Sequence, residues 1–255
     1  MHIDESLHSE CIELAVFHKF LDLCKLHKIS RSDLASLMDT LNKYNPFFDS
    51  DVQRDAHEAF SLLLAAFNIV CLKPKSGYDF PDIPAFMDYY FCGVSNKKFT
   101  CTACLLGNEF VETFHRIVIQ PSEDVAAFLG KQHSEQNNLT CDKCFVQNLQ
   151  TVYTEIHDFP RILTLQVNRF SESSVHHRHR KNNQSMSVYE NVKFGLVEYT
   201  LFGLIEHEGV LVDRGHYTCR IFHNQSWFHC NDINIEKAVL PSSSQNMYLL
   251  YYLRK

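Results

Sequence analysis

The clearest chemical signal in the sequence is a pair of Cys-x-x-Cys motifs, Cys101/Cys104 and Cys141/Cys144, separated by 36 residues. Zinc takes four tetrahedral ligands, and a turn with two residues between thiolates presents both sulfurs to one ion. Because this separation exceeds the roughly 15–20 residues of the usual arrangement, we expect the two turns to lie on separate hairpins. Four unligated thiols, or a redox pair, are the alternative. The matched spacing favours a closed, structural zinc site.

A second candidate site lies in the segment 215–232. If Asn224 and Gln225 form a two-residue turn, residues whose numbers sum to 449 oppose each other. His216 and Asn231 are then diagonal neighbours on one face of the hairpin. An imidazole held by an amide oxygen can act as a base toward a thiol. On spacing alone, two ordinary surface residues of a hairpin are the more frequent explanation.

The remaining cysteines indicate a reducing compartment. Six of the ten are scattered through apolar segments, where a free cysteine behaves as a small hydrophobe. The N-terminus has no basic stretch followed by an apolar one, so no secretory signal is visible. We therefore expect a cytoplasmic or nuclear protein rather than a disulfide-bonded secreted one.

Composition excludes several functional classes. The 255 residues carry a formal net charge of −6, which argues against a generally basic nucleic-acid surface. The longest apolar run, 62–72, is far shorter than the roughly 20 residues of a membrane-spanning helix. We expect a globular chain with neither a nucleic acid nor a membrane as partner.

Two kinds of element must position these residues. The first 70 residues have helical apolar spacing, and capping boxes at Ser30/Asp33 and Ser50/Gln53 start the second and third helices, with Pro46 closing the second. Later segments look like strands; over 163–167 apolar and polar residues alternate, which predicts a half-buried strand. The polar segment between residues 170 and 189 is expected to be a surface loop. The fold class is α+β, a helical lobe followed by a largely antiparallel sheet.

Several ordered motifs resemble those of ubiquitin-specific proteases. The segment 53–58 (Gln-Arg-Asp-Ala-His-Glu) is similar to that family's Gln-Gln-Asp-Ala-x-Glu box, and 159–170 resembles the strand that precedes its histidine region. Segments 207–209, 215–217, 227–232 and 247–252 resemble its histidine box. The resemblance extends from Ile12 to Leu253, nearly the whole chain.

The resemblance implies a papain-like cysteine-protease fold with a helical thumb, a β palm and zinc-ribbon fingers. It implies one domain over 1–255, with a partial thumb at 1–73, fingers and the start of the palm at 74–158, and the rest of the palm at 159–255. It also implies a structural Zn²⁺ on the four cysteines, and ubiquitin or ubiquitinated proteins as partners.

Roles for single residues follow from the same resemblance. His216 is implied as general base and acid, Asn231 as its orienting partner, and Asp232 as an adjacent acidic residue. Asp55 and Glu58 are implied to receive the basic C-terminal tail of ubiquitin, as carboxylates that bind arginine can. The loop from His207 to Arg214 and the polar loop near 176–184 are implied to close over that tail, and His207, Gly215 and Tyr217 are implied to bind it. Trp227 is expected to pack under the hairpin.

The sequence departs from the family pattern at the nucleophile. No Gly-Asn-Thr-Cys turn is found: Cys11 follows His-Ser-Glu and lies close to the 53–58 box, while Cys24 sits within an apolar helical stretch. Arg54, Ala59 and Cys230 also replace residues usual in the family. We expect a truncated deubiquitinase that does not turn over substrate as written. A pseudoprotease acting as a ubiquitin-binding or scaffold module is the alternative, and a zinc-ribbon interaction protein ranks behind both.

Overall fold

The computed structural model describes residues 2–3, 12–25, 30–49, 54–67, 72–73, 86–131, 133–172, 179–211 and 214–255. The chain forms two compact units. The first comprises residues 1–90, 170–181 and 208–217, and the second 91–169, 182–207 and 218–255. The division of the chain into segments 1–73, 74–158 and 159–255 stays a prediction.

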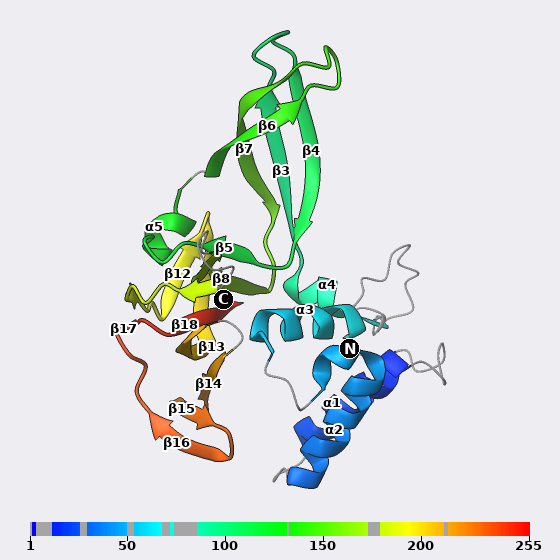
Figure 1. Cartoon of the computed structure of the whole chain (residues 1–255), viewed down its shortest axis with the longest axis vertical. Coiled ribbons are helices and arrows are strands. Elements are labelled where there is room, and N and C mark those ends of the chain that lie inside the picture. Colours follow the sequence, from blue (N-terminus) through cyan, green and yellow to red (C-terminus); the bar gives the residue numbers. More distant parts are fainter. Residues whose placement is uncertain are drawn as a thin grey trace. The chain divides into compact units, whose positions relative to one another are not determined.

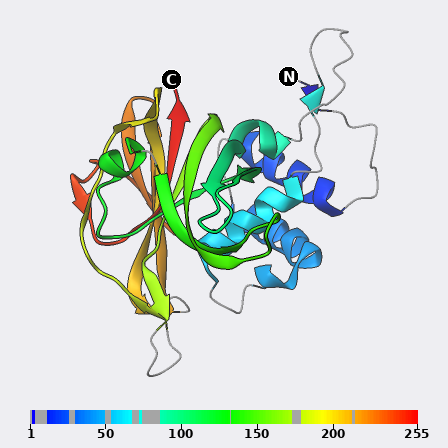
Figure 2. The same cartoon turned by 90° about the horizontal axis from the view of Figure 1, so that it is seen from above.

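The first unit is mainly helical (Figures 1 and 2). Its helical elements are α1 (Ile12–Lys25), α2 (Arg31–Tyr44), the 3₁₀ helix η1 (Pro46–Phe48), α3 (Ala56–Phe67) and most of α4 (Phe86–Phe91). Short strands β1 (His2–Ile3) and β2 (Leu72–Lys73) pair with each other, as do β9 (Phe170–Glu172) and β10 (His179–Lys181).

The capping box expected at the second helix is confirmed. The Ser30 side chain accepts from the Asp33 amide, and the Asp33 carboxylate accepts from the Ser30 amide at 2.9 Å. Helix α2 then ends at Tyr44, just before Pro46. The third helix begins at Ala56, whereas the box expected to start it, Ser50/Gln53, lies outside the described residues.

Helices α1 and α3 are joined by aromatic packing. Phe17 is almost fully buried, and its ring lies edge-on to the ring of Phe67 with centroids 5.2 Å apart. Phe20 contacts the same ring at 5.4 Å. Such pairs contribute about 0.5–1.5 kcal/mol beyond the area they bury, so Phe67 holds the third helix against the first.

The second unit contains most of the strands. They are β3 (Gly93–Thr100), β4 (Gly107–Phe114), β5 (Ile117–Ile119), β6 (His133–Thr140), β7 (Gln147–Asp158), β8 (Ile162–Val167), β11 (Met186–Ser187), β12 (Asn191–Phe194), β13 (Val197–Leu211), β14 (Arg214–His223), β15 (Ser226–Asn231), β16 (Asn234–Ala238), β17 (Ser243–Ser244) and β18 (Met247–Arg254). Strands β13 and β14 continue from one unit into the other. The central order is β16-β15-β14-β13-β18-β8-β5, and a separate sheet has the order β4-β3-β7-β6.

Strand β8 is buried on both faces, which corrects the expectation of a half-buried strand. Leu163 and Leu165 are fully buried, but Thr164 on the other face is also only 1% exposed. Strand β8 lies inside its sheet, pairing antiparallel with β18 and parallel with β5. A strand whose two faces are both covered is buried whether its residues are polar or apolar, so the alternating pattern did not predict the burial of Thr164.

The expected surface loop after residue 170 is only partly a loop. It contains strands β9, β10 and β11, and Lys181 and Met186 are 5% and 4% exposed. Residues 173–178 lie outside the described residues.

Helix α5 (Val125–Leu129) follows the cap Asp124, whose carboxylate accepts from the Ala127 amide at 2.9 Å.

A buried arginine joins this segment to the C-terminal strand. Arg169 is fully buried, and its guanidinium donates to four carbonyl oxygens: those of Met247, Asn182 (2.9 Å), Gln184 (3.0 Å) and Ser244 (3.3 Å). Burial lowers the pKa of Arg169 to about 10, so the group remains charged at neutral pH. One side chain thereby satisfies backbone acceptors on two segments, 182–184 and 244–247, that lie far apart in the sequence.

No described helix is long and apolar enough to span a membrane.

Arg169→Met is expected to lower the free energy of unfolding by at least about 3 kcal/mol. Four carbonyls lose their donor, and an unsatisfied buried polar group costs about 1–3 kcal/mol. Urea denaturation measures the change. Arg161→Met, at an exposed position of the same unit, is the matched control and should stay within about 0.5 kcal/mol of the parent. Equal stability of the two variants would contradict the role given to Arg169.

Candidate metal centre and histidine hairpin

The two cysteine motifs lie on separate hairpins, as expected. Cys101 and Cys104 are in the connection between β3 and β4, and Cys141 and Cys144 are in the connection between β6 and β7. Strand β3 also pairs with β7, so the two connections lie at the same end of one four-stranded sheet (Figure 1). The hairpins therefore bring together cysteines that are about 40 residues apart in the sequence.

The two turns have the same backbone geometry. Leu105 donates its amide to the Cys101 carbonyl at 2.9 Å, and Phe145 donates to the Cys141 carbonyl at 2.9 Å. Leu105 and Phe145 both have left-handed φ values, 59° and 57°, which large apolar residues rarely adopt. The matching turns point both cysteine pairs toward one centre.

The thiols fit a tetrahedral metal site. All four sulfur atoms lie within 4.8 Å of one another. The Sγ atoms of Cys101 and Cys144 are 3.7 Å apart, as are those of Cys104 and Cys141. A zinc ion with Zn–S bonds of about 2.3 Å requires sulfur–sulfur edges of about 3.7–3.8 Å. The cluster is a structural zinc site, and its four ligands leave no open position for substrate.

Backbone amides prepare two of the thiols for metal binding. The amides of Cys144 and Lys143 lower the pKa of Cys141 to about 6. The amides of Cys104 and Ala103 likewise lower the pKa of Cys101. Zinc binds thiolates, so these amides favour the form that the metal needs.

The register expected for the histidine hairpin is confirmed. Cys219 pairs with Cys230, and the pairs continue to His223 with Ser226 around the turn. Asn224 and Gln225 have φ values of 46° and 61°, as a type I′ turn requires. Paired numbers sum to 449 throughout this ladder.

The candidate catalytic residues lie on this hairpin or at its end. Strand β14 carries Gly215 and a half-buried His216, and β15 ends at a half-buried Asn231. Asp232 is exposed in the turn to β16, with a left-handed φ of 50°. Asp tolerates this conformation better than most residues, and strained backbone often marks functional positions.

A buried ion pair that the sequence reasoning missed positions β14. Arg220 Nε donates to the Glu206 carboxylate on β13 at 2.8 Å, and the second Glu206 oxygen accepts from Ser244 Oγ at 2.8 Å. Glu206 is 6% exposed. Nothing in the local sequence identifies this pair, because residues 206 and 220 meet only through strand pairing.

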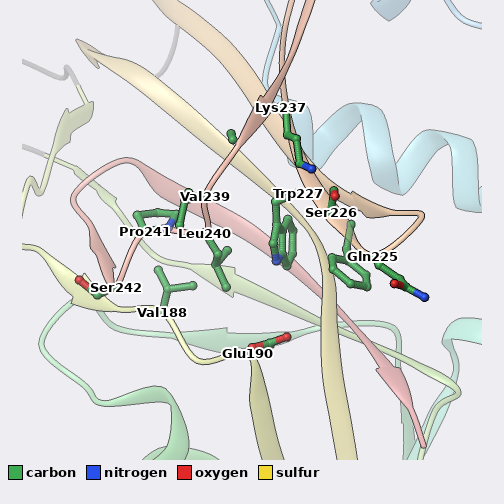
Figure 3. Close-up of a pocket in the computed structure, with 12 residues that line it drawn as sticks. Val188, Glu190, Gln225, Ser226, Trp227, Lys237, Val239, Leu240, Pro241 and Ser242 are labelled. Carbon is green, nitrogen blue, oxygen red and sulfur yellow. The ribbon is translucent and has the colours of Figure 1, made fainter.

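Trp227 anchors the other strand. It is 8% exposed within the main core, so its expected position under the hairpin is confirmed. Its indole forms one wall of a pocket of about 600 Å³, together with Leu240, Val188 and Glu190 (Figure 3). The hairpin is thus fixed to the core near its turn.

The start of α3 brings three of the expected substrate-binding residues together. Asp55 caps the helix, its carboxylate accepting from the His57 amide at 2.6 Å, and Glu58 is exposed in the first turn. Burial raises the pKa of Tyr217 on β14, and the nearby charge of Asp55 raises it further. Within the first unit, Tyr217 therefore lies beside the acidic start of α3.

His207 differs from its expected surroundings. It lies within strand β13 rather than in a loop, its side chain is fully buried, and its amide donates to the Asn246 carbonyl at 2.8 Å. The expected loop from His207 to Arg214 is strand up to Leu211, and residues 212–213 lie outside the described residues.

Of the two cysteines considered as nucleophiles, one lies within α1 and the other just before it in the sequence. Cys24 is the penultimate residue of the helix, far from its N-terminus. Cys11 lies outside the described residues and directly precedes Ile12, where the helix begins.

Cys104→Ser is expected to reduce bound zinc from about one ion per chain to nearly none, because a three-thiolate site binds the metal far more weakly. Elemental analysis of the purified chain measures the metal. Cys219→Ser removes a half-buried cysteine on β14, outside the four-cysteine cluster, and should leave the zinc content unchanged. Full zinc occupancy in the Cys104 variant would contradict the four-ligand assignment.

Comparison with known proteins agrees with this geometry. The family model described as "Ubiquitin carboxyl-terminal hydrolase" matches residues 4–252. The chain is 25% identical over 206 residues to ubiquitin carboxyl-terminal hydrolase 48 of Gallus gallus, covering 74% of this chain and 20% of that protein. It is 30% identical over 134 residues to ubiquitin carboxyl-terminal hydrolase 21 of Homo sapiens, covering 49% and 24%.

Solved structures share the fold. A SAGA deubiquitinase (DUB) module, made of a Ubp8 variant with Sgf11, Sus1 and Sgf73 and bound to monoubiquitin, matches with a TM-score of 0.75 at 19% identity, over 96% of this chain and 59% of that one. The Ubp8/Sgf11/Sus1/Sgf73 module bound to ubiquitin aldehyde matches with a TM-score of 0.74 at 17% identity, over 97% and 61%.

The chain thus spans a fifth to a quarter of these two curated relatives and about three fifths of the matched structural chains. The expected fold class, an α+β ubiquitin-specific-protease fold with a zinc-bearing finger sheet, is confirmed. The chain belongs to the ubiquitin carboxyl-terminal hydrolase family.

Proposed function

We propose that this chain is a ubiquitin-recognising domain of the deubiquitinase type. His216 is its general base and acid, Asn231 orients the imidazole, and Asp232 supplies a nearby negative charge. The observation that carries this proposal is the register of the β14–β15 hairpin, which follows the two-residue turn from His223 to Cys219. The sequence prediction that pairs His216 with Asn231 rests on the same rule, that opposed residue numbers sum to 449, which these five pairs obey.

The acidic start of α3 supports a basic partner. Asp55 and Glu58 lie in or next to the first turn of the helix, and Tyr217 lies beside them. Carboxylates bind arginine through charge-assisted hydrogen bonds. We assign this surface to the basic C-terminal tail of ubiquitin, with Gly215 and Tyr217 contributing contacts. Solved relatives bound to ubiquitin support the same partner.

His207 receives a different role within the proposal. Since its side chain is fully buried, we assign it to support of β13 beneath the binding surface rather than to direct contact with ubiquitin. We also propose that the protein acts in the cytoplasm or the nucleus. Both compartments contain ubiquitinated proteins, and both are reducing enough to keep its cysteines as thiols.

Glu58→Lys is expected to weaken ubiquitin binding at least about tenfold, because it replaces a charge-assisted contact with repulsion. Isothermal titration with ubiquitin measures the affinity, and the difference should shrink as salt is added. Glu58 is a better test than Asp55, whose carboxylate also caps α3.

Asp39→Lys is the matched control, with the same change of charge at an exposed position of α2 in the same unit. It should bind ubiquitin as the parent does. Equal loss in both variants would attribute the effect to net charge and would contradict an acidic binding surface on α3.

Hydrolysis defines a second candidate function, that of a complete thiol-dependent deubiquitinase with Cys11 as nucleophile. One observation favours it: the family match begins at residue 4 and therefore includes Cys11. Against it stands the absence of the family's Gly-Asn-Thr-Cys turn in this sequence.

Ubiquitin with a thiol-reactive C-terminal electrophile separates the two functions. For the ubiquitin-recognising domain we expect reversible binding without a covalent adduct, as judged by intact mass and peptide mapping. An adduct on Cys11 that disappears in His216→Ala would instead identify a complete hydrolase. A chain that neither binds ubiquitin nor forms an adduct would contradict both functions.

A further inference from the structure

Two free thiols oppose each other on the histidine hairpin. Cys219 on β14 pairs directly with Cys230 on β15, and both are half-buried free cysteines. Directly opposed residues of an antiparallel ladder point to the same face of the sheet. Burial, together with interaction with the Cys230 thiol, raises the pKa of Cys219 to about 11. The two side chains are thus in contact, away from the zinc cluster.

The backbone spacing suits a disulfide bond. Opposed Cα atoms in an antiparallel pair are about 4.5–5.5 Å apart, depending on the hydrogen-bonding class of the pair. Disulfides form across Cα separations of about 4.4–6.8 Å. Opposed Cβ atoms are about 4.5–5.5 Å apart, whereas a disulfide requires about 3.5–4.5 Å, so a bond between these two sulfurs requires rotation of the side chains and a local approach of the strands by about 1 Å.

Both strands are held in this register. The type I′ turn at Asn224 and Gln225 fixes their alignment. Trp227 packs in the core beneath β15, and Arg220, the neighbour of Cys219, is bonded to Glu206. Because the strands do not slip, each thiol keeps the other as its nearest reaction partner.

We propose that Cys219 and Cys230 are a modification site, a dithiol that low-molecular-weight disulfides such as glutathione disulfide convert reversibly to a cross-strand disulfide. This site is independent of zinc binding and goes beyond the proposed function. It is placed on the hairpin that carries His216 and Asn231, so oxidation tethers the two strands next to those residues.

In the reaction, one of the two cysteines gives its proton to solvent, and its thiolate attacks one sulfur of glutathione disulfide, forming a mixed disulfide and releasing one glutathione thiolate. That glutathione thiolate takes the proton of the second cysteine, whose sulfur then attacks the cysteine sulfur of the mixed disulfide and releases the second glutathione thiolate, which is protonated from solvent. Two thiols are oxidised and one glutathione disulfide is reduced to two glutathione molecules.

Peptide mapping without reduction tests the proposal. The zinc-loaded chain is treated with glutathione disulfide at neutral pH, free thiols are alkylated, and trypsin is added. Cleavage after Arg214, Arg220 and Lys237 places the two cysteines on different peptides, 215–220 and 221–237. We expect these peptides to be joined, with the loss of two hydrogen atoms, and to separate on reduction. Amide hydrogen exchange in the hairpin should slow about tenfold in the oxidised chain.

Single substitutions test whether each thiol needs the other. Cys219→Ser and Cys230→Ser should each abolish the joined peptides, and a glutathione adduct on the remaining cysteine should persist because its resolving partner is gone. Cys92→Ser, the matched control at a cysteine outside the zinc cluster and the opposed pair, should form the joined peptides as the parent does.

Other results would overturn the proposal. A fully reduced pair at every ratio of glutathione disulfide to glutathione would show that the thiols do not react. Separate glutathione adducts on both peptides of the parent chain would show that neither thiol resolves the mixed disulfide of the other. Both results leave the proposed recognition of ubiquitin untouched, since that is measured with the reduced chain.

Discussion

Both proposals made for this protein, the site at His216 and the opposed thiols, depend on the register of one antiparallel hairpin. Asn224 and Gln225 adopt the left-handed conformations of a type I′ turn, and every pair along β14 and β15 follows from that turn. Since side chains alternate between faces, a slip of one residue would move each of them to the opposite face. The faces on which the side chains of His216, Asn231, Cys219 and Cys230 lie all depend on this alignment.

The structure stabilises that alignment at both ends. Near the turn, Trp227 is buried in the core and forms a wall of the neighbouring pocket. Farther along β14, the Arg220–Glu206 pair connects the hairpin to β13 and, through Ser244, to β17. A buried ion pair is a poor source of net stability but penalises alternative pairings, because slippage would leave a charge unsatisfied.

Other parts of the chain are also held in place by interactions other than apolar packing. The four-stranded sheet buries little apolar surface at its tip, where Leu105 and Phe145 are 77% and 78% exposed. There the metal site joins two hairpins that packing alone would hold weakly. In the main sheet, Arg169 does the equivalent by donating to carbonyls of two segments, 182–184 and 244–247. Asp55 serves two purposes, since it caps α3 and also belongs to the acidic surface proposed to bind ubiquitin.

The sequence by itself determined the features that depend on neighbours along the chain. The capping box at Ser30, the spacing of the zinc-binding cysteines, and the turn at Asn224 all follow from short-range chemistry, and the order of the motifs identified the family. Tertiary structure alone decided the burial of Thr164 and His207, the role of Arg169, and the pairing of Arg220 with Glu206. The physical reason is that burial and long-range hydrogen bonding depend on which strands cover a residue, and local periodicity does not encode that.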